Sequence, residues 1–168
     1  MNPAQIDLKP GRYHGLMSFG TFALSGDFEA TANSLAQSVR PGGYLYVDEL
    51  FAADPSVALL VGQGIGCHGE TAHLHPHQAV ASALTTATLQ LRSQSTASAS
   101  LMASLRDELD RSQAIALVLK TLPEPFRKQR MMAYVDELKR AAVLYQSLER
   151  GLVTAVRCVY SKPNTRIS

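Results

Sequence analysis

A glycine-rich run near the middle of the chain has the form of a nucleotide-binding loop. Gly62-Gln63-Gly64-Ile65-Gly66 follows the apolar residues 57–61, as such a loop follows a strand. A dinucleotide-type loop also needs an acidic residue roughly 20 positions later, which hydrogen-bonds the ribose hydroxyls. After Glu70 the next acidic residue is Asp107, so this requirement is not met. The run therefore predicts a flexible loop rather than a cofactor site.

The segment after this run contains residues that bind metals or transfer protons: Cys67, His68, Glu70, His73, His75 and His77. In a strand, positions 73, 75 and 77 would place three imidazoles on one face. Pro76, however, favours the start of a helix there, and the spacings differ from those of common zinc sites. We interpret the segment as a polar loop at the mouth of a pocket. His68 and His73 are candidate general bases, because imidazole titrates near neutral pH. The alternative is a metal site built on Cys67, His68, His73, His75 and His77.

The elements that would position these residues begin with a strand, a helix and a second strand. Residues 13–24 predict a short buried strand that runs into a loop, and Ser25 or Asp27 can cap the helix that follows. Pro41-Gly42-Gly43 should stop that helix and turn the chain into a strand at residues 44–51. Strand, helix, turn and strand form a βαβ unit, which predicts a parallel sheet.

The rest of the chain adds helices and two more strands. We expect a helix at 75–87, a strand at 88–96, helices at 98–120 and 124–151, and a final strand at 152–163. The last helix is the clearest prediction, because an apolar stripe recurs at steps of three and four residues: Tyr134, Leu138, Ala141, Tyr145 and Leu148. The organisation is thus one domain, residues 1–168, with a helical cap segment at 96–151.

The composition argues against several classes of protein. The 168 residues are 46% hydrophobic and 18% charged, enough for one domain with a real core. A net charge of +2 is too small for a nucleic-acid or membrane-surface binder. No apolar run approaches the roughly 20 residues of a membrane span. The N-terminus does not look like a signal peptide and the two cysteines lie far apart, which predicts a cytoplasmic protein with reduced thiols.

Several segments match, in order, the elements of one enzyme family. Arg40-Pro41-Gly42-Gly43-Tyr44-Leu45-Tyr46-Val47 fits a Pro-Gly-Gly element that opens a fifth strand, and Tyr13-His14-Gly15-Leu16-Met17-Ser18 fits the fourth strand, with His14 where aspartate is more usual. Residues 74–96 and 151–163 fit the helix, strand and closing strand that come last. In these elements the chain resembles a class I S-adenosylmethionine-dependent methyltransferase of the small-molecule type.

The resemblance covers the C-terminal half of that family. In the family, three strands carrying a G-x-G-x-G loop precede the position of Asp7, whereas six residues precede Asp7 here. The resemblance therefore implies an α/β fold with an incomplete Rossmann-like sheet of about four strands, two parallel plus a C-terminal pair, and inserted cap helices. The strand at residues 13–18 would be an exposed edge, which invites pairing with another chain.

The resemblance also implies roles for particular residues. S-adenosylmethionine would meet Asp7, Leu8, Ser18 and Phe19, and the acceptor side of the cleft would include Thr21, Glu49, Gly64 and Gly66. Glu49, at the carboxyl end of the fifth strand, is a candidate for catalysis or for orienting an acceptor amine or hydroxyl. Gly64 and Gly66 would be hinge positions of a lid.

Three functional hypotheses follow. In the first, the chain transfers a methyl group from S-adenosylmethionine to a small-molecule acceptor when a complementary N-terminal half completes the fold. In the second, it is a catalytically inactive methyltransferase-like module for binding or dimerisation, with a homodimer across the open sheet edge. The third is the metal-binding protein described above. The cap helices favour a small acceptor over nucleic acid.

Overall fold

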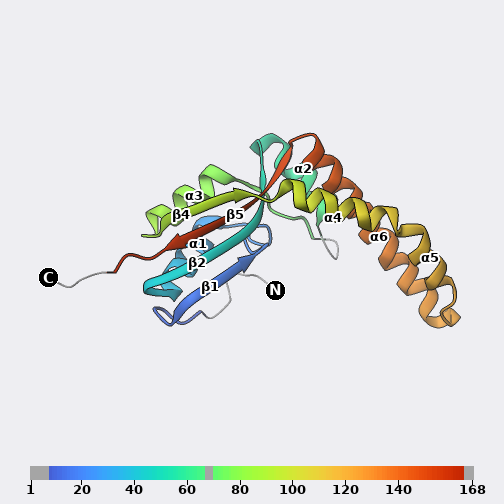
Figure 1. Cartoon of the computed structure of the whole chain (residues 1–168), viewed down its shortest axis with the longest axis horizontal. Helices are drawn as coiled ribbons and strands as arrows, with labels where there is room; N and C mark the ends of the chain where they lie inside the picture. Colours follow the sequence, from blue (N-terminus) through green and yellow to red (C-terminus); the bar gives the residue numbers. More distant parts are fainter. Residues whose placement is uncertain (1–7, 67–69, 165–168) are drawn as a thin grey trace.

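A mixed sheet forms the centre of the molecule in the computed structural model, which describes residues 8–66 and 70–164 (Figure 1). Its strand order is β1-β2-β5-β4, with bounds Tyr13–Phe19, Val39–Ala52, Val153–Ser161 and Gln90–Thr96. β1 and β2 are parallel, whereas β5 runs antiparallel to both of its neighbours. A two-residue strand, β3 (His75–Pro76), pairs with the end of β2. The predicted α/β fold, two parallel strands plus a C-terminal pair, is confirmed.

Six helices accompany this sheet. Their bounds are Phe28–Ser38 (α1), Pro55–Ile65 (α2), His77–Thr86 (α3), Ser98–Asp110 (α4), Ser112–Lys120 (α5) and Glu124–Glu149 (α6). α4, α5 and α6 lie between β4 and β5 in the sequence and project away from the sheet as a helical arm (Figure 1). The expected single helix at 98–120 is interrupted at Arg111, which ends α4 and precedes α5. In the described part of the chain, no helix combines the length and the apolar character needed to cross a membrane.

The first helix is fixed at both ends by side chains. At its N-terminus the Asp27 carboxylate accepts a hydrogen bond from the Ala30 amide, so of the two predicted caps Asp27 is the one used. At its C-terminus Lys162 Nζ donates to Ala36 O (2.7 Å) and Val39 O (2.8 Å). A lysine here satisfies carbonyls that the helix leaves open and complements the negative end of the helix dipole. The closing strand thus secures α1 to the sheet.

The Pro-Gly-Gly element lies inside a strand instead of forming a separate turn. β2 begins at Val39, directly after α1, and its pairing with β1 shifts register between Tyr13 and Gly15. Gly42 has a φ of +75°, and a Cβ on Gly43 would come within 2.8 Å of His14 O. Because both positions require glycine, the element is an irregularity in the strand that lets β2 approach β1.

The glycine run was expected to be a flexible loop, and this expectation is wrong. Gly62 and Gly64 lie within α2, and Gly66 is its C-cap. A Cβ at position 62 would collide with the carbonyl of Ala72, and one at position 64 would lie 2.7 Å from Val143 Cγ1 in α6. The glycines therefore permit close packing of α2 against its neighbours, which outweighs their low helix propensity.

The two faces of the sheet differ in what covers them. α1 and α3 pack against one face, where Leu45, Val47 and Phe51 of β2 are buried. On the other face, α4 and α6 pack only near the end of β2, around Leu50 and Ala155. The remainder, which we call the open face, exposes three large side chains: Met17 (63%), Phe19 (58%) and Tyr44 (51%). The prediction that β1 is buried is therefore wrong for its open-face residues.

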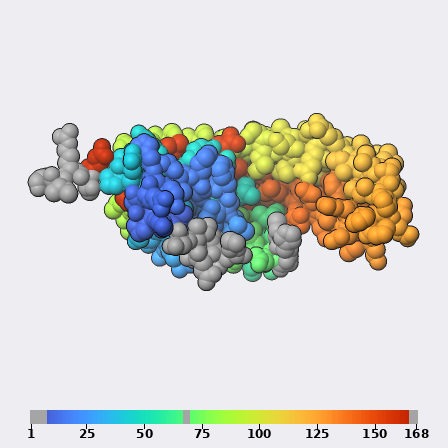
Figure 2. Space-filling model, turned by 90° about the horizontal axis from the view of Figure 1, so that it is seen from below, coloured from blue at the N-terminus to red at the C-terminus, as the bar shows by residue number. Residues whose placement is uncertain are grey.

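β1 is also the edge of the sheet in the described part of the chain. Figure 2 views the molecule from this side, where the blue residues around β1 form the surface. A parallel edge strand with one uncovered apolar face is unusual, because parallel sheets are normally covered on both faces.

Candidate functional site

A large cavity lies at the carboxyl ends of the two parallel strands. Its volume is about 730 Å³, and it is lined by residues of β1, β2, α2, α6 and two loops: Phe19, Gly20, Ala23, Leu24, Leu50, Ile65, Gly66, Glu70, Thr71, Ala72, His73 and Leu144. Ligands of open α/β sheets bind at the carboxyl ends of the strands. The position of the cavity is therefore the one at which a substrate is expected.

The lining is mainly apolar. Aliphatic and aromatic side chains come from the strands, the helices and the loop after β1, whereas Glu70 and His73 are the ionisable lining residues. Small-molecule sites commonly combine an apolar wall with a few polar groups that orient the ligand. The cavity thus suits a largely apolar molecule with one polar end near residues 70–73.

One wall of the cavity is the loop between β1 and α1, residues 20–26, which we call the wall loop. Glu49 Oε1 lies beneath it and accepts hydrogen bonds from Thr21 N (2.6 Å), Phe22 N (3.3 Å) and Ser18 Oγ (3.1 Å). Glu49 is only 2% exposed, and its Oε2 is buried without a hydrogen-bond partner among the described residues. Burial raises the pKa of Glu49 to about 7, against the opposing effect of the hydrogen bonds from Phe22, Thr21 and Ser18.

The segment before α3 holds the wall loop from the other side. The backbone amide of His73 donates to Ala23 O (2.7 Å). The ring of His75 places Nε2 at 3.0 Å from Ser25 O and stacks at 4.8 Å from the ring of Phe28. The wall loop is therefore fixed between β2 and residues 73–75, and its side chains Ala23 and Leu24 face the cavity.

The predicted site residues fall into separate groups. Phe19, Gly66 and His73 line the cavity. Ser18, Thr21 and Glu49 form the hydrogen-bonded cluster beneath the wall loop, and Glu49 is not among the lining residues. Leu8 packs partly buried against the core, and Gly64 contacts α6. Asp7 and His68 lie outside the described residues.

The histidines of the proposed metal cluster have different partners. His75 contacts the wall loop, whereas the His77 ring lies 4.9 Å from Phe51 and its Nε2 lies 3.8 Å from Cys158 Sγ. Burial lowers the pKa of His77 and raises the pKa of Cys158. In residues 8–66 and 70–164 no three His, Cys, Asp or Glu side chains are grouped to hold a metal ion. Cys67 and His68 lie outside these ranges.

Sequence reasoning missed Leu24, Leu50 and Leu144 as lining residues. Leu50 could have been found, since it alternates with Glu49 and follows it toward the end of the strand. Leu144 lies beside the apolar stripe expected for α6, but its contact with the cavity depends on how the arm docks.

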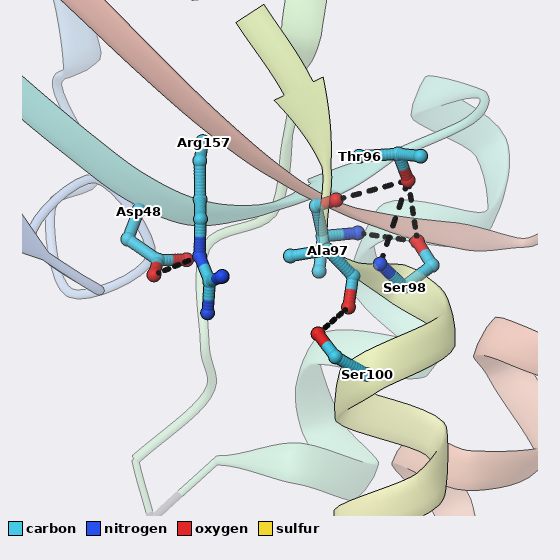
Figure 3. Close-up of polar contacts among 7 residues, drawn as sticks. Asp48, Thr96, Ala97, Ser98, Ser100 and Arg157 are labelled. Carbon is cyan, nitrogen blue, oxygen red and sulfur yellow. Dashed lines mark hydrogen bonds and ion pairs between the residues drawn. The ribbon is translucent and has the colours of Figure 1, made fainter.

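A smaller hollow of about 330 Å³ lies on the same face of the sheet, beside the start of α4. There Arg157 Nε donates to Asp48 Oδ2 (2.9 Å), and Ser98 Oγ accepts from Ala155 N (3.0 Å), as Figure 3 shows. Arg157 and Asp48 thus link β5 to β2, and Ser98 links α4 to β5. Because these polar groups bond to one another, the larger cavity remains the better candidate site.

No family model and no curated protein matches the chain. Solved structures do resemble it. The cyclopropane synthase MmaA2 from Mycobacterium tuberculosis is 11% identical with a TM-score of 0.73, and the match covers 92% of this chain and 57% of that one. A phosphoethanolamine N-methyltransferase 2 from Haemonchus contortus, in complex with phosphomonomethylethanolamine and S-adenosylhomocysteine, is 11% identical with a TM-score of 0.68, covering 96% and 36%.

A geranyl diphosphate methyltransferase in complex with geranyl diphosphate and sinefungin is also 11% identical, with a TM-score of 0.67. That match covers 96% of this chain and 51% of the other. The chain therefore spans about half the length of such structures. At these identities the likeness concerns the fold alone, and the chain has part of the Rossmann-like fold found in such methyltransferase structures.

Proposed function

We propose that the chain forms the acceptor-binding, C-terminal half of an S-adenosylmethionine-dependent methyltransferase that acts on a small molecule. The observation that carries this proposal is the cavity at the carboxyl ends of β1 and β2, closed on one side by α2 and α6. In the family that the sequence resembles, the acceptor occupies this side of the cleft. Methyl transfer depends mainly on positioning two reactants and excluding water, so an apolar cavity that a second segment could close suits it.

Within this cavity His73 is the candidate general base for an acceptor hydroxyl or amine, since it lines the wall together with Glu70. Phe19, at the end of β1, stays a candidate for contact with the cofactor, since it lines the cavity. Gly66 stays a candidate for the acceptor side, although it caps a helix and does not belong to a flexible lid. The apolar lining favours an acceptor of mainly hydrocarbon character.

The described residues do not by themselves form a complete site for S-adenosylmethionine. The glycine run is helical and packed against its neighbours, so it cannot cradle a nucleotide. Ser18 donates its hydroxyl to Glu49 and is buried, which leaves its side chain unavailable to a cofactor. The proposal therefore requires a second polypeptide segment that supplies the glycine loop and the ribose-binding acid.

We propose that this segment pairs with the β1 edge and covers the open face. Three observations support the proposal: β1 lacks a second neighbouring strand in the described part, Met17 and Phe19 are exposed, and similar structures are about twice as long. An uncovered parallel edge is otherwise a site of aggregation. A homodimer across the same edge is the competing arrangement.

Calorimetry with S-adenosylhomocysteine tests the proposed function. The chain alone should bind weakly or not at all, whereas the chain expressed together with the coding region upstream of Met1 should bind with a stoichiometry of one. His73→Ala in that longer polypeptide should leave this affinity unchanged, because His73 belongs to the acceptor side. A longer polypeptide that still fails to bind would contradict the proposal and favour a non-catalytic module.

The non-catalytic module is a second candidate because the open face is itself suited to protein contact. Large apolar side chains grouped on one surface commonly mark an interface. Sedimentation of the chain alone distinguishes the two: a stable dimer whose formation is abolished by Met17→Lys, together with no cofactor binding by any longer form, would favour the module.

A further inference from the structure

One oxygen atom holds the middle of the wall loop. Three donors converge on Glu49 Oε1: the amides of Thr21 and Phe22 and the hydroxyl of Ser18. Loops normally satisfy their backbone groups with water or with their own turns. Here a carboxyl on the neighbouring strand does so from beneath, in a place that is almost fully buried.

Some residues of the wall loop pack into the core, and others line the cavity. The Phe22 side chain is 1% exposed and belongs to the core, whereas Ala23 and Leu24 line the cavity. The amide of Leu24 continues the turn by donating to Gly20 O (3.3 Å). A change in the position of residues 21 and 22 would therefore move the cavity wall directly.

Loss of the Glu49 carboxyl would leave two backbone amides buried without an acceptor. Such groups cost more than an ordinary hydrogen bond contributes, so the loop would reorganise to reach water. Gly20 would still be held by Asp48 O, and Ala23 by the amide of His73. Reorganisation would thus be confined to the stretch between these two points.

We propose that Glu49 is a positioning residue that shapes the acceptor cavity by holding the wall loop, without contacting the acceptor itself. The binding of an acceptor in this cavity rests on the proposed function, whereas the contacts between Glu49 and the wall loop do not depend on it. Burial raises the pKa of Glu49 to about 7, so the closed loop favours the protonated carboxyl, whose Oε1 still accepts amide hydrogen bonds. Opening of the loop would expose Glu49 to water and favour its ionisation, so the loop should be held less firmly as the pH rises toward about 7.

Other charged groups near the wall loop are engaged elsewhere or act through different atoms. Asp27 Oδ1 accepts from Ala30 N, His73 contacts the loop through its backbone, and the His75 ring meets Ser25 O. Asp48 points to the other face, where it pairs with Arg157. Glu70 lines the cavity. The His75 ring is an ionisable group in contact with the wall loop, so a Glu49 variant is needed to assign any pH effect to Glu49.

Amide hydrogen exchange measured by NMR on the chain alone tests the inference. In Glu49→Ala the amides of Thr21, Phe22 and Leu24 should exchange on the order of tenfold faster or more. Glu49→Gln keeps the Oε1 acceptor and should stay within about threefold of the parent. The Ala97 amide, which bonds to Ala155 O on the side of β5 away from β2, serves as the control for intact folding.

If Glu49→Ala does not fold, the pH dependence of amide protection in the parent chain and in Glu49→Gln still tests the inference. In the parent chain, protection of Thr21 and Phe22 relative to Ala97 should fall between pH 5 and 7 and then level off, and in Glu49→Gln it should be flat. Unchanged protection in Glu49→Ala, or the same pH profile in Glu49→Gln as in the parent, would overturn the inference. Neither readout needs cofactor or acceptor, so failure here is distinct from failure of the proposed function.

Discussion

The two faces of the sheet present opposite surfaces to their surroundings, although the same strands build both. On the face under α1 and α3, Phe51 is 2% exposed and belongs to a continuous core. On the open face, Phe19 of the neighbouring strand is 58% exposed. Both are phenylalanines near the carboxyl end of a strand, so the difference comes from what covers them.

The side chains on the open face also differ from those of an ordinary solvent-exposed sheet face. A sheet face exposed to solvent usually carries polar side chains at alternating positions of its strands. The open face instead carries Met17, Phe19 and Tyr44 beside the Asp48–Arg157 ion pair. In the described residues the covered face is packed by helices, and the exposed apolar side chains of the open face are what the proposed interface rests on.

The largest effect should come from truncating the two phenylalanines. Phe51→Ala should lower the free energy of unfolding by about 3–5 kcal/mol, because it leaves a cavity in the core. Phe19→Ala should cost at most about 1 kcal/mol in the chain alone. Urea denaturation of the two variants measures both values. Equal costs would show that the open face is already covered in solution.

The next effect concerns two adjacent acids that point to opposite faces. Burial raises the pKa of Glu49 from its ordinary 4.5 to about 7. Between these pH values the unfolded chain has lost the proton that the folded chain keeps, so stability falls as pH rises and levels off above about 7. The total change is up to roughly 3 kcal/mol. Denaturation at pH 4.5, 6 and 8 measures it; Glu49→Gln should flatten the profile, and Asp48→Asn should not.

A smaller effect is expected where the closing strand secures α1 on the covered face. Lys162→Met removes the two hydrogen bonds to Ala36 O and Val39 O and should cost about 1–2 kcal/mol. Lys139→Met is the matched control, because Lys139 forms only an exposed pair with Asp136 and should change stability by less than about 0.5 kcal/mol. Thermal unfolding compares the two; indistinguishable values would refute the capping role.

The smallest effect should come from the ion pair on the open face. Arg157 and Asp48 lie 2.9 Å apart but remain partly exposed, so their coupling should be below about 1 kcal/mol and should weaken with salt. A double-mutant cycle with Arg157→Met and Asp48→Asn measures it. A larger coupling that resists salt would mean that this part of the face is more enclosed than the structure indicates.

Local patterns predicted most of the elements. The cap at Asp27, the alternation along β2 and the periodic stripe of α6 depend on near neighbours in sequence, so the sequence carries them directly. The burial of Glu49 was also available from alternation, because positions 45, 47 and 51 are apolar and share its face. The contact of Glu49 with the wall loop could not be predicted in this way, because the wall loop follows a different strand, β1.

The glycine run shows where local reasoning fails. Glycines predict a loop, yet α2 forms because Asp54 and Pro55 begin a helix and because the glycines fit against Ala72 and Val143. The start signal was present in the sequence, whereas the close packing is a tertiary effect. The cavity depends in the same way on how the arm docks, which no short segment specifies.

The most direct test of the central claim is oxidative footprinting of two methionines. Met17 on the open face and Met132 on the arm have similar exposure, 63% and 60%, so Met132 is an internal control. In the chain alone, hydroxyl radicals should convert both to the sulfoxide at similar rates. In the longer polypeptide that includes the upstream segment, Met17 should be protected while Met132 keeps its rate. Equal oxidation of both methionines in a longer form that binds S-adenosylhomocysteine would contradict the account.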